Sequence, residues 1–240
     1  MVNIASAFFG IFRLTFALIC GKIVKKYKTE HEMTTIYLIR HGESIGNALR
    51  IYLGHTDLDL SARGYSQAQE TAKKLSSVPF SAVYSSDLIR AVHTAEPHAK
   101  MRGLEVSPCA KLREVHVGDW EGARVEDLLL DERFIKGWRE NFGCFTLPGG
   151  ENVGDAADRV YEAICEIAEK HDGETVAAVF HAAAIRAFWC KMLSIPKNEW
   201  AAAVPFPTNA SYSVIEYQNG RFLGKEYSRD EHLSGVCSQP

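Results

Sequence analysis

Two histidines stand directly after apolar runs that predict strands. His41 follows Arg40 at the end of one run, and His181 ends another. In open parallel sheets, ligands bind beyond the carboxyl ends of the strands, so both imidazoles are expected at one site. Arg90 follows a third strand candidate, at the same edge, and arginine binds phosphate bidentately while keeping its charge. Any one of these residues alone is more simply structural. Their joint placement predicts a cationic pocket that suits phosphate.

Alternating apolar runs and amphipathic segments position these side chains. We predict strands at 34–39, 80–84, 105–107 and 175–180, with a closing hairpin at 211–216 and 222–227 around Asn219-Gly220. Helices are predicted at 64–77, at 87–101 with Asp87 as N-cap, at 152–171 and at 182–193. Residues 118–149 are less regular and predict short helices and loops. The alternation favours an α/β three-layer sandwich with a mainly parallel central sheet.

The composition is that of a soluble globular protein. The 240 residues are 46% hydrophobic and carry a formal net charge of -3, which gives no support to nucleic-acid binding. The length favours one domain with a sizeable core. The six cysteines show no CxxC pair and no zinc-ligand spacing. We therefore expect thiols in a reducing compartment, no metal site and no cofactor.

An N-terminal extension at 1–33 precedes the expected catalytic domain at 34–240. Residues 4–20 are nearly all apolar, with Arg13 in the middle and basic residues after the run, the reverse of a secretory signal. An arginine at mid-membrane costs roughly 3 kcal/mol on insertion scales. Three interpretations stay open: a short membrane anchor, a helix at the membrane surface, or a start-site artefact with the natural start at Met33. All three leave the catalytic domain in the cytoplasm.

The first histidine lies in a family signature. Residues 38–44, LIRHGES, followed by Asn47, resemble the RHG motif of the histidine phosphatase superfamily, also called the phosphoglycerate mutase-like family. Further segments of that pattern follow in order: Gly54 with 59–61, Gly64 and 67–68; 84–88 with 90–91 and 94–95; 112–114 with Gly118 and 120–122; 148–151; and His181 with 185–186. RHG alone is a weak signal, whereas six ordered segments between residues 34 and 232 are a specific one.

The resemblance implies a role for each residue of the site. His41 is the nucleophile that becomes phosphohistidine, which divides one difficult transfer into two easier ones. Arg40, Arg90 and His181 hold the transferred phosphoryl group. Glu114 protonates the leaving oxygen and then activates water. The remaining candidates for binding phosphate or substrate are Ser44, Asn47, Gly54 and Ala182. This chemistry needs no metal, because positioned cations replace it.

The chain departs from the family pattern beside its second histidine. Ala182 stands where the family usually has glycine, and Phe180 replaces a small polar residue before His181. If the backbone at 182 needs a positive φ or approaches phosphate closely, alanine weakens substrate fit and rate. An inactive member, or a phosphate-binding module without turnover, is an alternative to an enzyme.

Net hydrolysis is favoured over intramolecular transfer. Mutases of this family carry a longer insertion with paired arginines that hold a phosphoglycerate, and this chain has no Arg-Arg pair. Basic residues in that region are scattered and are expected on solvated helix faces: Arg124, Arg133, Lys136 and Arg139. We predict a phosphatase for a small phosphorylated metabolite, with a mutase-type phosphotransferase as the alternative. The substrate, pathway and oligomeric state stay open.

Two other enzyme classes match short motifs. Residues 42–46, GESIG, fit the G-x-S-x-G elbow of serine hydrolases, which would make Ser44 the nucleophile. That fold needs an earlier strand and loop for its oxyanion hole, and too little chain precedes Gly42. Asp57 and Asp59 resemble the aspartyl pair of magnesium-dependent phosphatases, although a solvated turn explains them better. Two further histidines were considered as pocket residues, His116 and His232.

Overall fold

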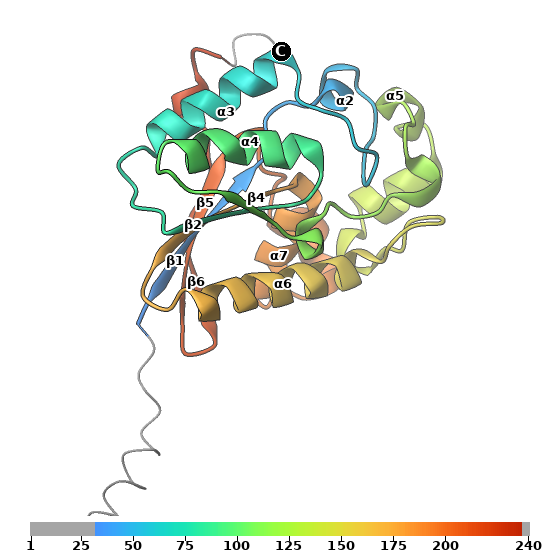
Figure 1. Cartoon of the computed structure of the whole chain (residues 1–240). Coiled ribbons are helices and arrows are strands. Elements are labelled where there is room, and N and C mark those ends of the chain that lie inside the picture. The colour runs from blue at the N-terminus through green and yellow to red at the C-terminus, as the bar shows by residue number, and fades with distance from the viewer. Residues whose placement is uncertain (1–31, 237–240) are drawn as a thin grey trace, which may run out of the picture. The chain divides into compact units, whose positions relative to one another are not determined.

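A six-stranded sheet forms the centre of the computed structural model, which describes residues 32–236 (Figure 1). The strands are β1 Thr34–Arg40, β2 Ala82–Ser85, β3 Val106–Pro108, β4 Thr175–Phe180, β5 Tyr212–Gln218 and β6 Arg221–Arg229. They lie in the order β3-β2-β4-β1-β5-β6. The first four strands in this order pair in parallel, and β5 and β6 add an antiparallel edge. The expected α/β sandwich with a mainly parallel sheet is confirmed.

Helices cover both faces of the sheet (Figure 1). The long ones are α3 Ala62–Lys74 and α4 Ile89–Lys100 on one face, and α6 Val153–Lys170 and α7 Ala182–Met192 on the other. Short helices are α2 Ile45–Ala48, α5 Val125–Leu128 and α8 Trp200–Ala203. Single turns of 3₁₀ helix are η1 Ala110–Leu112, η2 Gly118–Trp120, η4 Phe142–Cys144, η5 Lys197–Glu199 and η6 Glu231–Leu233, and η3 Phe134–Arg139 is a π-helix.

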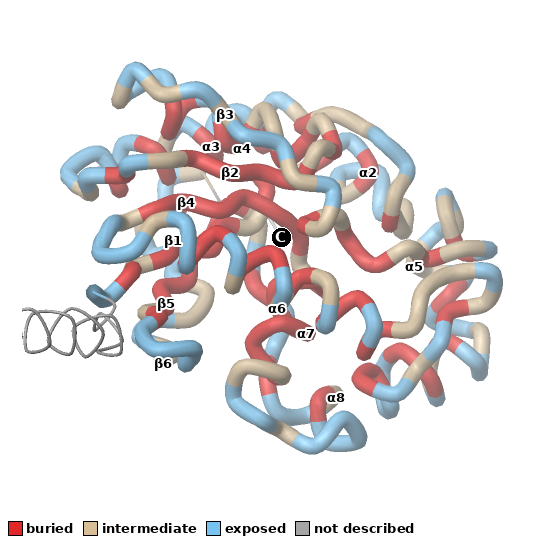
Figure 2. Tube along the Cα trace, turned by 60° about the horizontal axis from the view of Figure 1, so that its bottom comes forward, coloured by how far each residue is buried: buried red, intermediate tan, exposed pale blue. Residues whose placement is uncertain are grey.

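The two central strands are buried by helices on both sides (Figure 2). β4 has the sequence TVAAVF, and its last five residues are buried, as expected of a parallel strand covered on both faces. One cluster joins alternate residues of β1 and β4 to α6 and α7, and a second joins the others to α3 and α4. The register pairs Arg40 with Phe180, so the residues that follow the two strands leave the sheet side by side.

The start of α4 differs from the prediction. The helix begins at Ile89, after an N-cap residue, Leu88, that makes no side-chain cap. Asp87, the expected cap, instead accepts two hydrogen bonds from Arg113, at 2.7 and 2.6 Å. The N–H of Ile89 donates to Asp57 Oδ1 at 2.8 Å. A helix N-terminus needs an acceptor, and here a residue far away in the sequence supplies it.

Other elements shift by a few residues. The strand predicted at 80–84 is Ala82–Ser85, because Phe80 packs below the sheet edge against Tyr37 instead of joining the ladder. The hairpin predicted around 219–220 is present, and both turn residues have positive φ, at 51° and 78°. The irregular region at 118–149 consists of short helices and turns, as expected.

The expectations about membrane contact concern residues 4–20, which lie outside the described part of the chain. Within residues 32–236, no helix combines the length and apolar character needed to cross a bilayer.

Candidate active site

His41 and His181 meet beyond the carboxyl ends of β1 and β4. The N–H of His41 donates to the carbonyl of Phe180 at 2.9 Å, which continues the parallel ladder by one residue. The two imidazole rings are buried, with centroids 5.1 Å apart and an interplanar angle of 57°. The shared site that the two apolar runs predicted is therefore formed by the register of two adjacent strands.

A hydrogen bond determines which nitrogen of His41 carries a proton. Nδ1 lies 2.6 Å from the carbonyl oxygen of Gly42. A carbonyl can only accept, so Nδ1 is the donor. Burial, then Arg90 and Arg40, hold the pKa of His41 well below its ordinary value. The neutral ring therefore keeps an unprotonated Nε2, which is the form that can attack an electrophile.

Gly42 keeps this turn close to α3. A Cβ at Gly42 would lie 2.5 Å from the carbonyl oxygen of Gly64. The N–H of Gly42 donates to Thr94 Oγ1 at 3.0 Å, and that hydroxyl donates to the carbonyl of Arg90. The backbone of α3 and a side chain of α4 thus hold the backbone that orients His41.

One buried and one half-buried cationic side chain, Arg90 and Arg40, face the histidines. Arg90 donates to the carbonyls of Gly54 at 2.8 Å and Thr56 at 2.9 Å, and only 2% of it is exposed. Arg40 donates from Nη1 to the carbonyl of Pro207 at 2.7 Å. Burial lowers the pKa of Arg40 to about 10, which leaves it charged at neutral pH.

Several buried polar atoms here have no partner. They are Arg40 Nε and both ring nitrogens of His181. Burial, and then Arg90, hold the pKa of His181 well below its ordinary value, so its ring is neutral. Buried polar groups are almost always hydrogen-bonded in native proteins, and an unpaired cluster marks a place for a missing partner. Beside two guanidinium groups, an anion fits best.

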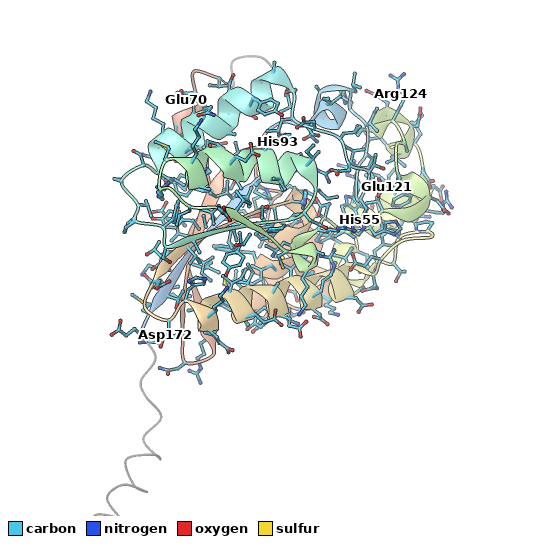
Figure 3. All side chains as sticks on the ribbon, viewed as in Figure 1. His55, Glu70, His93, Glu121, Arg124 and Asp172 are labelled. Carbon is cyan, nitrogen blue, oxygen red and sulfur yellow. The ribbon has the colours of Figure 1, made fainter. Side chains whose placement is uncertain are left out.

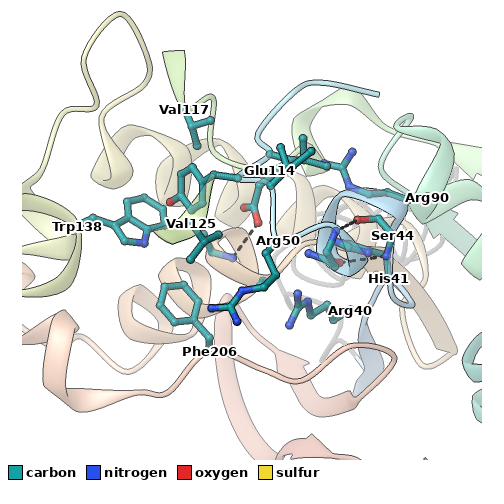
Figure 4. A pocket seen from close by; sticks show the side chains of 16 residues that line it. Arg40, His41, Ser44, Arg50, Arg90, Glu114, Val117, Val125, Trp138 and Phe206 are labelled. Atoms are coloured by element: carbon teal, nitrogen blue, oxygen red, sulfur yellow. Dashed lines mark hydrogen bonds between the residues drawn. The ribbon is translucent and has the colours of Figure 1, made fainter. Parts of the chain in front are cut away.

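Glu114 lies at the N-terminus of α7. Its carboxylate accepts hydrogen bonds from the N–H groups of Ala183 at 3.1 Å, Ala184 at 2.9 Å and Val115 at 2.9 Å. The helix has no side-chain cap of its own, and a carboxylate suits the positive end of a helix. Glu114 is the single carboxyl group among the described residues that line the cavity (Figure 4).

Ser44 and Asn47 form a reciprocal cap on α2. Ser44 Oγ accepts from the N–H of Asn47, and Asn47 Oδ1 accepts from the N–H of Ser44, both at 3.1 Å. Asn209 Nδ2 links this pair to the carbonyl of His41. Both predicted residues line the cavity. Ser44 makes no hydrogen bond to His181, whose ring nitrogens are unpaired, so the described residues hold no serine–histidine pair for a serine hydrolase.

Gly54 and Ala182 have different places. Gly54 is not among the described residues that line the cavity, and it acts through its carbonyl on Arg90. A Cβ there would lie 2.5 Å from the carbonyl oxygen of Val115. Ala182 lines the cavity as the first residue of α7 and is absent from the described non-glycine residues with positive φ. The strain considered for alanine at this position is therefore not present.

Glu121 fixes the loop at residues 54–56, whose carbonyl groups bind Arg90. The sequence alone assigned no role to Glu121. Its carboxylate accepts from the N–H groups of Gly54 at 3.1 Å, His55 at 2.6 Å and Thr56 at 3.2 Å, and from the Thr56 hydroxyl at 2.7 Å. Figure 3 shows Glu121 and His55 together at this end of the molecule. Burial alone would raise the pKa of Glu121, but these hydrogen bonds outweigh it and the pKa is lowered.

Arg159 fixes the backbone that carries Glu114, as Glu121 fixes the loop that binds Arg90. Its guanidinium donates to the carbonyls of Lys111, Arg113 and Glu114 at 2.7–2.9 Å. Glu151 holds Arg159 in turn through two hydrogen bonds at 2.7 and 2.8 Å. Glu151 belongs to the conspicuous PGGE segment, whereas Arg159 lies on a long amphipathic helix with no local signal for a function.

Two further histidines do not line the cavity within the described chain. The ring of His116 packs on His55, with centroids 4.9 Å apart. His232 Nε2 lies 2.9 Å from the Thr71 hydroxyl, against α3. Nor do the acidic residues of the 57–59 turn form a magnesium pair. Asp57 caps α4, and Asp59 accepts from His93 at 2.6 Å.

The cavity has a volume of about 330 Å³ and two unlike ends (Figure 4). We name as the polar end Arg40, His41, Ser44, Asn47, Arg90 and Glu114. We name as the apolar wall Ile51, Tyr52, Leu53, Val117, Val125, Trp138 and Phe206. Arg50 lies between them (Figure 4). Sequence reasoning found the polar end and missed the wall, whose residues come from irregular segments.

The family model of the histidine phosphatase superfamily, branch 1, matches residues 36–229. A protein named probable phosphoglycerate mutase GpmB, from Salmonella choleraesuis, is 32% identical over 195 residues, which cover 80% of this chain and 88% of that protein.

Solved structures match over a similar span. Bacillus stearothermophilus YhfR has a TM-score of 0.78 at 30% identity, covering 84% of this chain and 100% of its own. A mycobacterial glucosyl-3-phosphoglycerate phosphatase has a TM-score of 0.76 at 27% identity, and the match covers 83% of this chain and 100% of that protein. A phosphoserine phosphatase from Entamoeba histolytica, in complex with 3-phosphoglyceric acid, has a TM-score of 0.74 at 26% identity. That match covers 83% of this chain and 99% of that protein. The similar proteins thus carry both mutase and phosphatase names.

Proposed function

The chain belongs to the histidine phosphatase superfamily, and from this premise we propose that residues 34–240 hydrolyse small phosphate monoesters through a phosphohistidine on His41. The observation that carries the proposal is the state of His41. Its Nδ1 proton is held by the Gly42 carbonyl and its pKa is depressed, so Nε2 carries a lone pair beside the guanidinium groups of Arg90 and Arg40.

The first step transfers the phosphoryl group. The Nε2 lone pair attacks phosphorus, the bond from phosphorus to the ester oxygen breaks, and the leaving oxygen takes that electron pair. Glu114 enters this step in its protonated form, gives its proton to this oxygen and releases an alcohol, and the carboxylate that remains is held by three N–H groups. Arg40, Arg90 and the ring of His181 donate hydrogen bonds to the phosphoryl oxygens, where charge is spread in the transition state.

The second step returns the enzyme to its starting state. The Glu114 carboxylate accepts a proton from water, whose oxygen attacks phosphorus. The bond from phosphorus to nitrogen breaks, its electrons return to Nε2, and inorganic phosphate leaves. The two arginines supply the positive charge that phosphoryl transfer requires, so the proposed cycle uses no metal and no cofactor.

Hydrolysis is favoured over a mutase-type transfer because of the apolar wall. A mutase must keep a doubly phosphorylated glycerate bound while it turns between two positions. Away from the polar end, Arg50 is the one cation among the cavity-lining residues described, and it pairs with Glu126 at 3.0 Å. A mutase-type phosphotransferase is the alternative function, because a 32% identical relative is named a probable phosphoglycerate mutase.

The test uses the full chain with a generic aryl phosphate, in chelator, between pH 5 and 8, beside His41→Ala. We expect chelator-resistant hydrolysis and an acid-labile phosphoenzyme, both lost in the variant. Hydrolysis that survives His41→Ala would overturn the mechanism. Efficient bisphosphoglycerate-dependent conversion of one phosphoglycerate into the other would instead establish the mutase.

A further inference from the structure

The apolar wall has an exposed ring that is held in place from behind. Phe206 is 41% exposed, yet the guanidinium carbon of Arg186 lies 4.2 Å from its ring centroid. Arg186 is itself buried and donates to the carbonyls of Val204, Trp200 and Ala201. An exposed aromatic side chain on a fixed support loses little freedom when a ligand covers it.

Other rings extend this surface from separate parts of the chain. Trp138, on the π-helix η3, lies nearly parallel to Phe206, with centroids 6.2 Å apart and an angle of 18°. Tyr52 meets the edge of Trp138 at 5.6 Å, and Phe142 meets it at 4.9 Å. Aromatic contacts of this kind fix ring positions. The wall is therefore built before any ligand arrives.

Tyr52 is placed by a short antiparallel pairing. Its N–H donates to the carbonyl of Ala123, and its carbonyl accepts from the N–H of Gly122. Ile51 and Arg124 form an isolated bridge beside it, and the N–H of Val125 donates to the carbonyl of Arg50. This pairing brings together Ile51 and Val125, which both line the cavity.

The wall offers few hydrogen-bonding groups. The Tyr52 hydroxyl is buried without a partner and is the one hydroxyl among the described wall residues, while Arg50 pairs with Glu126 through Nε alone and its side chain is 64% exposed. The aliphatic members Ile51, Leu53 and Val125 carry hydrocarbon alone. A leaving group rich in hydroxyls would leave most of them unpaired, whereas a ring would cover apolar surface.

We infer that the substrate is a phosphate monoester whose leaving group carries a flat apolar ring, packed against Phe206 and Trp138. This inference rests on the function proposed above and names its substrate class. A cavity of about 330 Å³ is at the lower end for small-molecule sites, so the leaving group is small. It differs from the phosphoglycerates and phosphoserine in the names of the similar proteins.

The first experiment compares esters of equally poor leaving alcohols, so that differences report recognition and not reactivity. Benzyl phosphate, glycerol 3-phosphate and 3-phosphoglycerate are all esters of primary alcohols. With the full chain, we expect kcat/KM for benzyl phosphate to exceed the other two by about tenfold or more, the usual scale for filling an apolar pocket. A higher value for either polar ester would overturn the inference.

Variants then assign the preference to the wall. Phe206→Ala should lower kcat/KM for benzyl phosphate about tenfold and change that for glycerol 3-phosphate less than about twofold. Phe206→Leu should give an intermediate loss. Leu193→Ala is the matched control, because Leu193 is 50% exposed and does not line the cavity. Equal losses for both esters in Phe206→Ala would contradict the inference.

A binding measurement separates this inference from the proposed mechanism. Benzylphosphonate and 2,3-dihydroxypropylphosphonate cannot be hydrolysed, so calorimetry with them needs no turnover. We expect benzylphosphonate to bind about tenfold more tightly. That preference without any phosphoenzyme would refute the mechanism and keep the apolar subsite. A phosphoenzyme together with equal phosphonate affinities would refute the subsite and keep the mechanism.

Discussion

The polar end and the apolar wall of the cavity differ in how the fold builds them. The polar end grows from the sheet: His41 follows β1, and the N-terminus of α7, just after β4, receives Glu114. The wall is assembled from loops and single helical turns around 50–53, 117–138 and 206. A rigid sheet edge thus carries the chemistry, and irregular segments shape what surrounds it.

The two ends also differ in what holds them. Backbone groups hold the polar end, since Arg90 is bound by two carbonyls and Glu114 by three N–H groups. Ring contacts and one buried guanidinium hold the wall. Changes at the polar end should therefore affect every substrate, and changes in the wall should affect the choice among substrates.

The largest expected effect removes the nucleophile. His41→Ala should lower kcat/KM by roughly 10⁴-fold or more for benzyl and glycerol esters alike, because both pass through the same covalent step. His93→Ala serves as control, since His93 pairs with Asp59 away from the cavity. A loss of kcat/KM for only one of the two esters would contradict the proposal that the polar end acts on every substrate alike.

The next largest effect tests whether the guanidinium geometry of Arg90 matters in addition to its charge. Arg90→Lys keeps the charge but cannot bind both carbonyls and a phosphoryl oxygen, so kcat/KM should fall roughly 10²–10³-fold for both esters. Arg124→Lys, at a side chain that is 72% exposed, should leave the rate unchanged. Activity of Arg90→Lys close to that of the wild type would show that charge alone suffices.

A smaller effect is expected one step away from the substrate. Glu121→Gln replaces two acceptor oxygens with one, loosens the 54–56 loop and misplaces Arg90. We expect kcat to fall about tenfold for both esters, with partial rescue by Glu121→Asp. Glu132→Gln is the control, because this exposed carboxylate pairs with Lys136 and neither residue lines the cavity. An unchanged kcat, with thermal stability alone reduced, would limit Glu121 to a structural role.

The smallest expected effect is that the His41 ring does not take up a proton near pH 6.5. The pKa of His41 is lowered, so its Nε2 stays unprotonated as the pH falls through 6.5, while an unfolded chain would take up a proton there. The wall carries no histidine. Nitrogen NMR of the free protein should show a neutral His41 ring at pH 6.5 and below. Protonation of His41 near pH 6.5 would contradict the assigned environment.

The sequence by itself determined the sheet centre and pointed to the groups that we propose to react. The run TVAAVF is the strand β4 at the predicted bounds, because a strand buried on both faces is apolar without interruption. His41 and His181 were found because each directly follows such a run. Arg40 and Arg90 were placed in the site by their positions at the ends of strands and Glu114 by the ordered segments of a family pattern, and all three line the cavity.

Tertiary structure alone decided the supports and the wall. Asp57 caps a helix that begins 32 residues later, and Glu121 reaches a loop 65 to 67 residues earlier. Trp138 and Phe206 stack although neither lies in a periodic segment. Periodicity reports the burial of a residue within its own element, whereas such contacts depend on which segments the packed chain brings together. Under the proposed function, substrate recognition is therefore encoded in long-range contacts, and the chemistry in short motifs beside the strands.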